Sequence, residues 1–456
     1  MRKISRRLAL YALLGIAALA GFFVLRGLAE SLADHVLADL PVQAPAPTLR
    51  DPPTGRGEDL TVRIVVLGPG DELYFWWGHI AMVIDDAGTG QSHFFDYGLF
   101  SFDQENFFVN FALGRLIYST GVMPAQLGIL GYVRTNRDVI VYTLDLPPDA
   151  REMILRQAEW DVLPENRDYL YHHFDHNCAT PLIYLIDMAT GGQFRERFAN
   201  EPSRFTLRQH VRRHTWHSPF IDWILNFWMG QNIDLPITAW EDMFLPSEVG
   251  RNIAAFEYVD PDGAVRRLVS SREVVFQSQG RPAVLETPRA QWPRQLAFSL
   301  AVSLLLALLF FLQAGKSARA AAFGRVSLGV CHGVFGLAFG GAGLMLFFMA
   351  NFTGHDYTFG NANILFANPL LLALIPLGIR YAAAGDRGKR QRHEFYLRLL
   401  WLMVVLGIFV SMLVKLTPWF WQDNLTDQML MLPIALVLLL EPAGLKVILR
   451  RVRRQA

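Results

Sequence analysis

The chain has 456 residues, and its 42 basic and 41 acidic side chains leave a net charge of only +1 at pH 7. This balance provides no excess of cationic side chains for neutralising phosphates, which excludes the usual kind of nucleic-acid-binding protein. Hydrophobic residues make up 52% of the chain and charged residues 18%, whereas soluble domains carry about 25% charged residues. Only two cysteines are present, so a disulfide scaffold and a thiolate metal cluster are also excluded. The composition therefore predicts a membrane protein with a large water-exposed part.

Six apolar segments are long enough to cross a bilayer, which takes about 20 residues. The first of them follows the basic residues Arg2, Lys3, Arg6 and Arg7. Its apolar run is longer than the core of about 7–15 residues in a cleavable signal peptide, so we interpret it as an uncleaved signal anchor, with a cleaved signal peptide as the alternative. The predicted membrane helices are 8–28, 296–312, 326–350, 364–383, 397–416 and 429–445.

The distribution of lysine and arginine predicts the orientation of these helices, because cytoplasmic loops are enriched in basic residues. If the N-terminus is cytoplasmic, the four cytoplasmic segments carry four, three, six and five basic residues, whereas the outer loops 351–363 and 417–428 carry none. We therefore expect both termini in the cytoplasm, a bacterial inner (cytoplasmic) membrane, and a periplasmic domain between membrane helices one and two. The expected parts are a signal-anchor transmembrane helix (1–29), a proline-rich linker (30–57), a periplasmic catalytic domain (58–294) and a five-helix transmembrane domain (295–456).

The predicted periplasmic domain mixes short strands with helices. Its strand-like runs are rich in Val, Ile and Phe and end at turns that contain Gly, Pro or Asp. Such a mixture predicts an α+β fold. The expected strands are 62–67, 80–84, 93–97 and 139–144, the expected helices are 148–163 and 178–190, and an expected hairpin pairs 256–259 with 264–269.

Cys178 is the residue on which the functional argument depends. The other cysteine, Cys331, belongs to the third predicted membrane helix, so the two cannot approach to the roughly 7 Å that a disulfide requires. Cys178 opens a predicted helix, where backbone N–H groups favour a thiolate nucleophile and can stabilise an oxyanion. We expect Asn177 to cap this helix, and Ala179 and His176 to support the oxyanion site. The other interpretation is an inert, buried cysteine.

A thiol nucleophile needs a base, which can lie far from it in the sequence. His79 begins a predicted strand, and the preceding Gly78 leaves room beside its ring. Asp96 belongs to the next predicted strand, where its carboxylate could fix the tautomer of the imidazole. The sequence therefore predicts a site formed by Cys178, His79 and Asp96.

Short motifs spread over residues 60–260 resemble, in the same order, the periplasmic domain of the Lnb family. The motifs around His79, Asp96 and Cys178 belong to this series, and the segment that begins at His355 resembles an outer loop of the family. The resembling segments are 68–73, 78–79, 96–98, 102–103, 106–107, 114–115, 163–169, 177–180, 234–238 and 244–246, and in the membrane part 361–365 and 368–370.

Members of the Lnb family are described as bacterial lipoprotein N-acyltransferases. The resemblance implies a circularly permuted papain-like fold, akin to NlpC-type and LRAT-type enzymes, in which the histidine precedes the cysteine. Carried over by motif, Cys178 would be the nucleophile and His79 the base, with Asp96 as the third member. The chain departs from the family where His176 replaces a usual Asp and Pro181 a common Arg. Both departures concern the acceptor rather than the thiol chemistry.

These residues predict a membrane-bound, thiol-dependent acyltransferase. It would move an acyl chain from a phospholipid donor, through a thioester on Cys178, to an amine acceptor, namely the N-terminus of a lipoprotein. Neither a cofactor nor a metal ion is expected. The side chains expected to contact the substrates are Trp76, Trp77, Tyr97, His355 and Asn361.

Three other interpretations use the same residues. The Cys–His pair could belong to a periplasmic papain-like cysteine hydrolase that cleaves a peptidoglycan peptide or a lipid ester. The chain could instead be a non-catalytic envelope scaffold in which Cys178 is structural. His172, His173 and His176 also have a spacing that suits zinc, although no HExxH-type motif accompanies them. The six-helix anchor favours the transferase, because a hydrolase of soluble substrates does not need one.

Overall fold

The computed structural model describes residues 45–100, 102 and 106–455, with side chains up to position 440. The predicted signal anchor, 8–28, lies outside the described residues. The chain divides into two compact units, each described here by itself. The first contains the described residues up to His210 together with Pro236–Glu286, and the second contains Val211–Leu235 and the chain from Thr287 onward.

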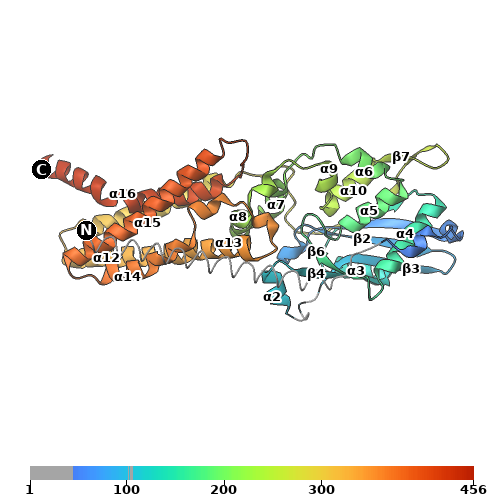
Figure 1. Cartoon of the computed structure of the whole chain (residues 1–456), viewed down its shortest axis with the longest axis horizontal. Helices are drawn as coiled ribbons and strands as arrows, with labels where there is room; N and C mark the ends of the chain where they lie inside the picture. Colours follow the sequence, from blue (N-terminus) through green and yellow to red (C-terminus); the bar gives the residue numbers. More distant parts are fainter. Residues whose placement is uncertain (1–44, 101, 103–105, 456) are drawn as a thin grey trace, which may run out of the picture. The chain divides into compact units, whose positions relative to one another are not determined.

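The first unit is built on a seven-stranded antiparallel sheet with the strand order β6-β4-β3-β2-β1-β5-β9. Four of these strands, β2, β3, β4 and β6, are labelled in Figure 1. The central strands are rich in Val, Ile and Leu, which fit a pleated surface covered on both faces. The four strands expected from the sequence are confirmed as β1, β2, β3 and β5. The strands are β1 Leu60–Leu67, β2 His79–Asp86, β3 Gln91–Leu99, β4 Leu116–Pro124, β5 Val139–Leu144, β6 Asp168–Tyr171 and β9 Val269–Phe276.

Helices cover both faces of this sheet, which confirms the α+β class. One face packs on α4, α5 and α10 through residues such as Ile64, Leu182 and Ile253, and the other packs on α3 through Val83 and Phe94. The helices are α2 Phe107–Ala112, α3 Ala125–Arg134, α4 Pro148–Asp161, α5 Thr180–Ala189, α6 Gln193–Phe198, α7 Leu207–Thr215, α9 Ala239–Asp242 and α10 Pro246–Ala255.

Two local predictions can be compared directly with these elements. The expected hairpin is confirmed as β7 Glu257–Val259 paired with β8 Val265–Arg267. The expected helix 178–190 begins two residues later, at Thr180. Pro181 lies in the first turn of this helix, where its missing N–H breaks no helical hydrogen bond. Cys178 therefore lies just before α5 rather than in its first turn.

The described part of the proline-rich segment packs along α4. The Ala46 N–H donates to Gln157 Oε1 at 2.9 Å, and the Thr54 N–H donates to Glu152 Oε1 at 2.9 Å. Two short 3₁₀ helices, η1 Pro47–Arg50 and η2 Arg56–Asp59, lie in this stretch. From Ala46 onward the segment is thus held by the domain through buried and partly buried hydrogen bonds.

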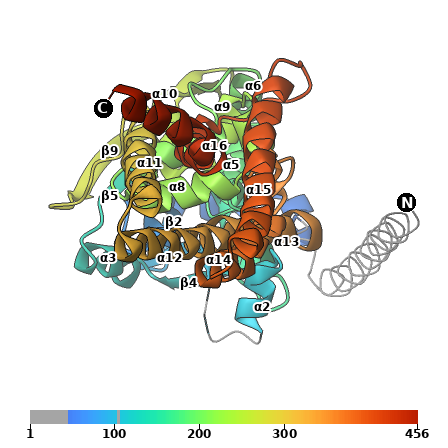
Figure 2. The ribbon, with the colours of Figure 1, turned by 90° about the vertical axis from the view of Figure 1, so that its left-hand side faces the viewer.

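The second unit contains four helices long and apolar enough to cross a membrane. They coincide with four of the expected membrane helices: Trp292–Ala314, Ala318–Phe352, Ala362–Ala383 and Arg387–Val414. Among the described residues, the α+β domain precedes these four helices rather than lying between two of them. Figure 2 shows α11 Trp292–Ala314, α12 Ala318–Phe335, α14 Leu374–Ala383, α15 Arg387–Val414 and α16 Leu425–Gln455, whose described apolar part, Leu425–Leu440, is shorter.

Broken and short helices complete the second unit. The residues of the second long span are interrupted by a π-helical turn, η5 Gly336–Gly340, before the span continues as α13 Gly341–Phe352. The loop that follows contains three 3₁₀ helices, η6 Asp356–Thr358, η7 Ala362–Leu365 and η8 Pro369–Ala373. The segment Val211–Leu235, which includes α8 Pro219–Trp228 and η4 Gln231–Asp234, also belongs to this unit. By compactness this segment groups with the chain from Thr287 onward, whereas the sequence analysis placed it in the domain 58–294.

Candidate functional site

His79 and Asp96 are brought together by the register of two neighbouring strands. Ala81 of β2 pairs with Asp96 of β3, and His79 lies two residues before Ala81, so its side chain is on the same face as that of Asp96. His79 Nε2 lies 2.6 Å from Asp96 Oδ1. The Tyr132 hydroxyl of α3 donates to Asp96 Oδ2 at 3.2 Å. The carboxylate is therefore held between the imidazole and a phenol.

Gly78 fixes the backbone just before His79. Its φ is +81°, a region that disfavours side chains other than hydrogen. A Cβ atom there would also lie 2.7 Å from the carbonyl oxygen of Leu67, the residue paired with His79 on β1. Only glycine therefore allows β2 to begin at His79 in this position.

Gly98 lies where Cys178 and His79 meet. A Cβ atom on Gly98 would lie 3.1 Å from Cys178 Cβ and 3.5 Å from His79 Cε1. Its φ is +111°, and the pairing of β3 with β4 shifts register at this point. A hydrogen bond between the side chains of Cys178 and His79 is one of the interactions that raise the pKa of His79.

The electrostatic setting of His79 favours the imidazolium form. Burial is the largest single effect and lowers the pKa of His79, but the charges of Asp96 and Cys178 and the hydrogen bonds to both side chains outweigh it. The net result raises the pKa of His79 from 6.5 to about 10. At neutral pH the ring therefore carries a proton between a carboxylate and the sulfur atom.

The turn that carries Cys178 is held by Asn177. The Asn177 Nδ2 group donates to the carbonyl oxygens of His173 at 3.0 Å and Phe244 at 2.8 Å. Asn177 Oδ1 accepts the Ala179 N–H at 2.9 Å. Asn177 thus accepts a backbone N–H just before α5, as a capping residue does. The Ala179 N–H, which was expected to face an oxyanion, is the group that donates this hydrogen bond.

His176 is placed by contacts with the backbone. Its Nδ1 atom lies 3.0 Å from the carbonyl oxygen of Leu170, and its backbone pairs with that of His172 in an isolated bridge. His176 therefore helps to shape the turn before Cys178.

Three tyrosines lie beside the turn that leads to Cys178: the ring centroid of Tyr169 lies 5.0 Å from that of His176, the ring centroid of Tyr171 lies 5.5 Å from that of His173, and Tyr118 packs on Tyr171. Burial first, and then the charge of Cys178, raise the pKa of Tyr118 to about 12, and raise the pKa values of Tyr169 and Tyr171 well above their usual range. The rings of Tyr118 and Tyr171 stack with their centroids 4.0 Å apart. Tyr118, Tyr132 and Tyr171 are the members of the site that lie outside the motifs indicated by the sequence.

The aromatic residues expected to contact substrate differ in position. Tyr97 is completely buried, and its hydroxyl donates to Asp161 Oδ2 at 2.9 Å, so it belongs to the core rather than to an accessible pocket. Trp76 and Trp77 are half-buried in the turn before His79. The Trp76 indole N–H donates to the carbonyl oxygen of Asp71 at 3.0 Å.

His355 and Asn361 belong to the second unit. His355 is buried, and its Nδ1 atom lies 2.7 Å from the hydroxyl of Tyr357. Asn361 is also buried, and its Nδ2 group donates to the carbonyl oxygens of Phe227 and Met229. The amide of Asn361 therefore joins η7 to the end of α8, a structural task in this unit.

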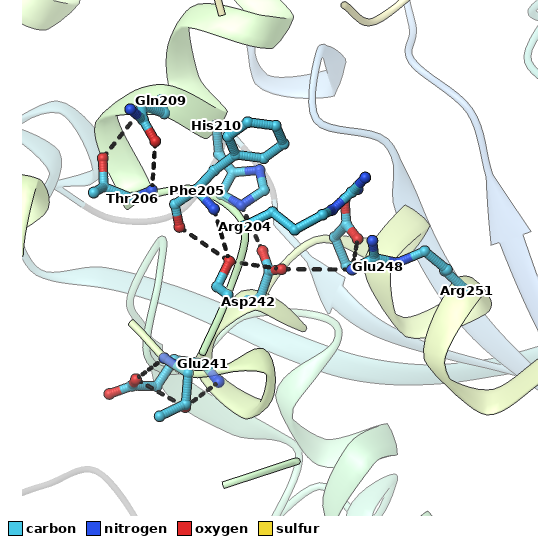
Figure 3. A network of polar contacts seen from close by, with 11 residues as sticks. Arg204, Phe205, Thr206, Gln209, His210, Glu241, Asp242, Glu248 and Arg251 are labelled. Carbon is cyan, nitrogen blue, oxygen red and sulfur yellow. Dashed lines mark hydrogen bonds and ion pairs between the residues drawn. The ribbon is translucent and has the colours of Figure 1, made fainter. Parts of the chain in front are cut away.

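A histidine–carboxylate cluster occurs elsewhere in the first unit (Figure 3). His210, Asp242 and Glu248 are buried, and their potential ligand atoms lie within 4.8 Å of one another. Arg251 contacts both carboxylates, at 2.5 Å from Glu248 and 3.7 Å from Asp242. Arg204 adds a second cation 3.8 Å from Glu248. The two arginines balance the two carboxylates, so the cluster fits an ion-pair network better than a metal site.

The histidines considered for zinc do not gather in the same way. His172 Nδ1 accepts the Asp175 N–H at 2.9 Å, while His176 faces the carbonyl oxygen of Leu170. In the part of the chain that the structure describes, His172, His173 and His176 do not form a group close enough to share one ion.

Comparison with known proteins identifies the part of the chain that holds this site. No curated protein and no solved structure matches the chain. One family model does, that of the Lnb N-terminal periplasmic domain, and it covers residues 55–213. The matched segment contains His79, Asp96, Gly98 and Cys178. Residues 55–213 of this chain are therefore similar to the Lnb N-terminal periplasmic domain.

Proposed function

We propose that this chain is a membrane-bound acyltransferase that uses Cys178 as its nucleophile. It moves an acyl chain from a phospholipid to an amine, the N-terminus of a lipoprotein. The observation that carries the proposal is the placement of His79 beside Asp96, at 2.6 Å, and its approach to Cys178 at the backbone of Gly98. This is the arrangement that thiol-dependent acyl transfer requires.

In the first half-reaction, the thiolate of Cys178 attacks the ester carbonyl carbon of the donor. A C–S bond forms, and the tetrahedral oxyanion is stabilised by backbone N–H groups before α5. Because the Ala179 N–H is bonded to Asn177, we assign this task to the N–H of Cys178 itself. The C–O bond then breaks, His79 gives its proton to the leaving alcohol, and a thioester remains.

In the second half-reaction, the free amine of the acceptor attacks the thioester. A C–N bond forms, the C–S bond breaks, and the proton released by the amine passes to the now neutral His79. The imidazolium and the thiolate are thereby restored, so the cycle needs neither a metal ion nor a cofactor. Asp96 keeps the imidazole oriented throughout.

The remaining features of the proposal concern place and fold. We assign a bacterial inner membrane, cytoplasmic termini and a periplasmic catalytic domain that precedes the four long apolar helices. The one-sided distribution of basic residues supports the orientation. The order of His79 before Cys178, on β2 and before α5, supports a permuted papain-like arrangement. A membrane anchor suits substrates that are themselves held in the lipid, because the enzyme and its two substrates then meet by diffusion in the plane of the membrane.

The test uses the full-length protein in phospholipid vesicles, with a diacylglyceryl-cysteine peptide as acceptor. Mass spectrometry is expected to detect an acyl group on Cys178 before the acceptor is added, and an acylated amine afterwards. Cys178→Ser and His79→Ala should abolish both products.

Other outcomes separate the alternatives. Release of free fatty acid with no acylated amine would identify a lipid-ester hydrolase. Cleavage of a peptidoglycan peptide without an acyl intermediate would identify a peptidase. A thiol that neither acylates nor reacts with iodoacetamide at neutral pH would leave the scaffold interpretation.

A further inference from the structure

A continuous row of aromatic rings leads away, within the first unit, from the segment that carries Cys178. The ring of Tyr118 stacks on that of Tyr171 with their centroids 4.0 Å apart, and the ring centroid of Tyr171 lies 5.5 Å from that of His173, in the turn before Cys178. The ring centroid of Tyr118 is 5.2 Å from that of Phe100, which is 6.4 Å from that of Phe107 on α2. Phe107 in turn lies 5.4 Å from Phe108. Each step is within the range of ordinary aromatic contact.

The outer end of this row is exposed. Phe108 is 75% exposed, Val109 57% and Phe111 50%. The segment 106–114, which contains all of α2, has no charged residue. Large apolar side chains that remain exposed together usually mark an interaction surface. Phenylalanine and other apolar side chains of this kind favour the boundary between lipid headgroups and acyl chains.

We propose that α2 inserts into the outer surface of the membrane and that the aromatic row carries one long acyl chain from there to Cys178. The proposal rests on the proposed function for the identity of what travels along the row. The membrane is chosen as the partner because the described part of the same chain contains four helices long and apolar enough to cross it. The row runs from that contact to the turn that carries the candidate nucleophile.

The chemistry of the row favours an acyl chain over a peptide. Its members offer aromatic faces and, at Tyr118, a neutral phenol, whereas a peptidoglycan peptide brings charged groups that need partners. A methylene group gains about 0.8 kcal/mol when it leaves water for an apolar environment. A long chain is thus bound along such a row far better than a short one. The row therefore acts as a selector for long-chain donors.

Photocrosslinking tests the membrane contact without requiring catalysis. The full-length Cys178→Ala protein is placed in vesicles of phosphatidylethanolamine and phosphatidylglycerol, with p-benzoylphenylalanine in place of Phe108. The control carries the same photoreactive residue in place of Val265, which is 69% exposed on β8 of the same unit. We expect at least tenfold more lipid adduct at position 108 than at position 265. Equal, low adduct formation at both positions would overturn the membrane contact.

Donor chain length tests the path. Thioester formation on Cys178 is measured with a long-chain phospholipid and with a short-chain, water-soluble ester, in wild type, Phe108→Ser and Val265→Ser. In Phe108→Ser, the rate of thioester formation should fall at least tenfold more with the long-chain donor than with the short-chain donor. In Val265→Ser, the rate should match that of the wild type with both donors. Equal losses with both donors would overturn the path.

The two experiments also separate this inference from the proposed function. Lipid adducts at position 108 without any thioester in the wild type would refute the acyltransferase while supporting the membrane contact. A thioester in the wild type without lipid adducts at position 108 would do the reverse.

Discussion

Gly98 and Cys178 are packed so closely that a Cβ atom on Gly98 would lie 3.1 Å from the Cβ atom of Cys178. Two strands and the turn before α5 meet at this point, and the absence of a side chain on β3 lets the thiol reach the imidazole of His79. The site thus depends on a glycine that takes no part in the chemistry.

Gly98→Ala is therefore expected to separate Cys178 from His79. The new methyl group would lie 3.1 Å from Cys178 Cβ, which is too close, so Cys178 must shift away from β3, whereas the 3.5 Å to His79 Cε1 is ordinary contact. We expect alkylation of Cys178 by iodoacetamide at pH 7 to slow at least tenfold. The measurement is the rate of modification followed by mass spectrometry.

Gly90→Ala is the matched control for this variant. Gly90 also has a positive φ, of +69°, but no atom lies within 4 Å of its hypothetical Cβ. Both variants pay the backbone cost of about 1–2 kcal/mol for a side chain in this region, but only Gly98→Ala alters the site. Equal slowing of alkylation in the two variants would show that backbone strain, rather than contact with Cys178, is responsible.

The raised pKa of His79 predicts how activity depends on pH. The pKa of about 10 in the folded protein lies above the usual 6.5, so the imidazolium predominates at neutral pH and is lost as the pH rises towards 10. Thioester formation, which uses the imidazolium proton, should fall in the alkaline range with a midpoint near pH 10. In Asp96→Asn the carboxylate that raises this pKa is absent, so the midpoint should move to lower pH. The rate should also fall by about 10²–10⁴-fold.

The same shift contributes to stability, with a definite sign. Because folding raises the pKa of His79, its contribution is complete below pH 6.5 and disappears as the pH rises from 6.5 to about 10. Thermal unfolding of the full chain should therefore show a decline over this window that is smaller in Asp96→Asn. An unchanged alkaline midpoint in Asp96→Asn would show that Asp96 does not control His79.

Individual strands could be predicted where a local run of residues was enough to identify them. β1 and β2 are rich in Val and Ile, and β-branched runs are strong signals for buried strands. β4 was missed because Leu116–Pro124 contains Ser, Thr, Gly and Pro, which are typical of turns. β9 was missed because its residues are exposed along most of its length and give no periodic burial.

The site could be predicted to the extent that it depends on residue type. Cys178, His79 and Asp96 belong to the few types that carry acyl-transfer chemistry, so their neighbourhood could be inferred before their distances were known. Gly98 and Tyr132 have no such signature, because their roles arise from a register shift in β3 and from the packing of α3. The engaged N–H of Ala179 also depends on a side-chain conformation that no sequence pattern shows.

Tyr132→Phe tests whether the phenol positions Asp96. The substitution removes the hydroxyl that donates to Asp96 Oδ2 at 3.2 Å and leaves the ring beside His79, with centroids 5.9 Å apart. A hydrogen bond to a charged group contributes about 1.5–3 kcal/mol, and we expect the rate of thioester formation to fall about 10-fold.

The control for Tyr132→Phe is Tyr258→Phe. Tyr258 is also buried, and its hydroxyl donates to the carbonyl oxygen of Asp145 at 2.8 Å. Both variants should lower the unfolding temperature, but Tyr258→Phe should leave the rate of thioester formation unchanged. A rate that falls only in proportion to stability in both variants would give Tyr132 a purely structural role.

Asp242 is expected to be important for stability rather than for the reaction. Its Oδ1 atom lies 2.5 Å from His210 Nε2, its Oδ2 atom accepts the Ser203 hydroxyl at 2.9 Å, and both acid and imidazole are essentially inaccessible to water (Figure 3). Removal of one member of a buried pair leaves the other without compensation and costs about 3–5 kcal/mol. Asp242→Ala should therefore lower the unfolding temperature by about 6–20 °C for a domain of this size.

A surface ion pair provides the comparison for Asp242. Glu257 lies 3.3 Å from Arg267, and their side chains are 54% and 81% exposed. Such pairs contribute only about 0–1 kcal/mol because solvent screens them, so Glu257→Ala should change the unfolding temperature little. At temperatures below its unfolding transition, the Asp242→Ala protein should still form the thioester on Cys178. The reason is that the hydrogen bonds and ion pairs of Asp242 do not involve His79 or Asp96. A folded Asp242→Ala protein that cannot form the thioester would instead make the network part of the active site.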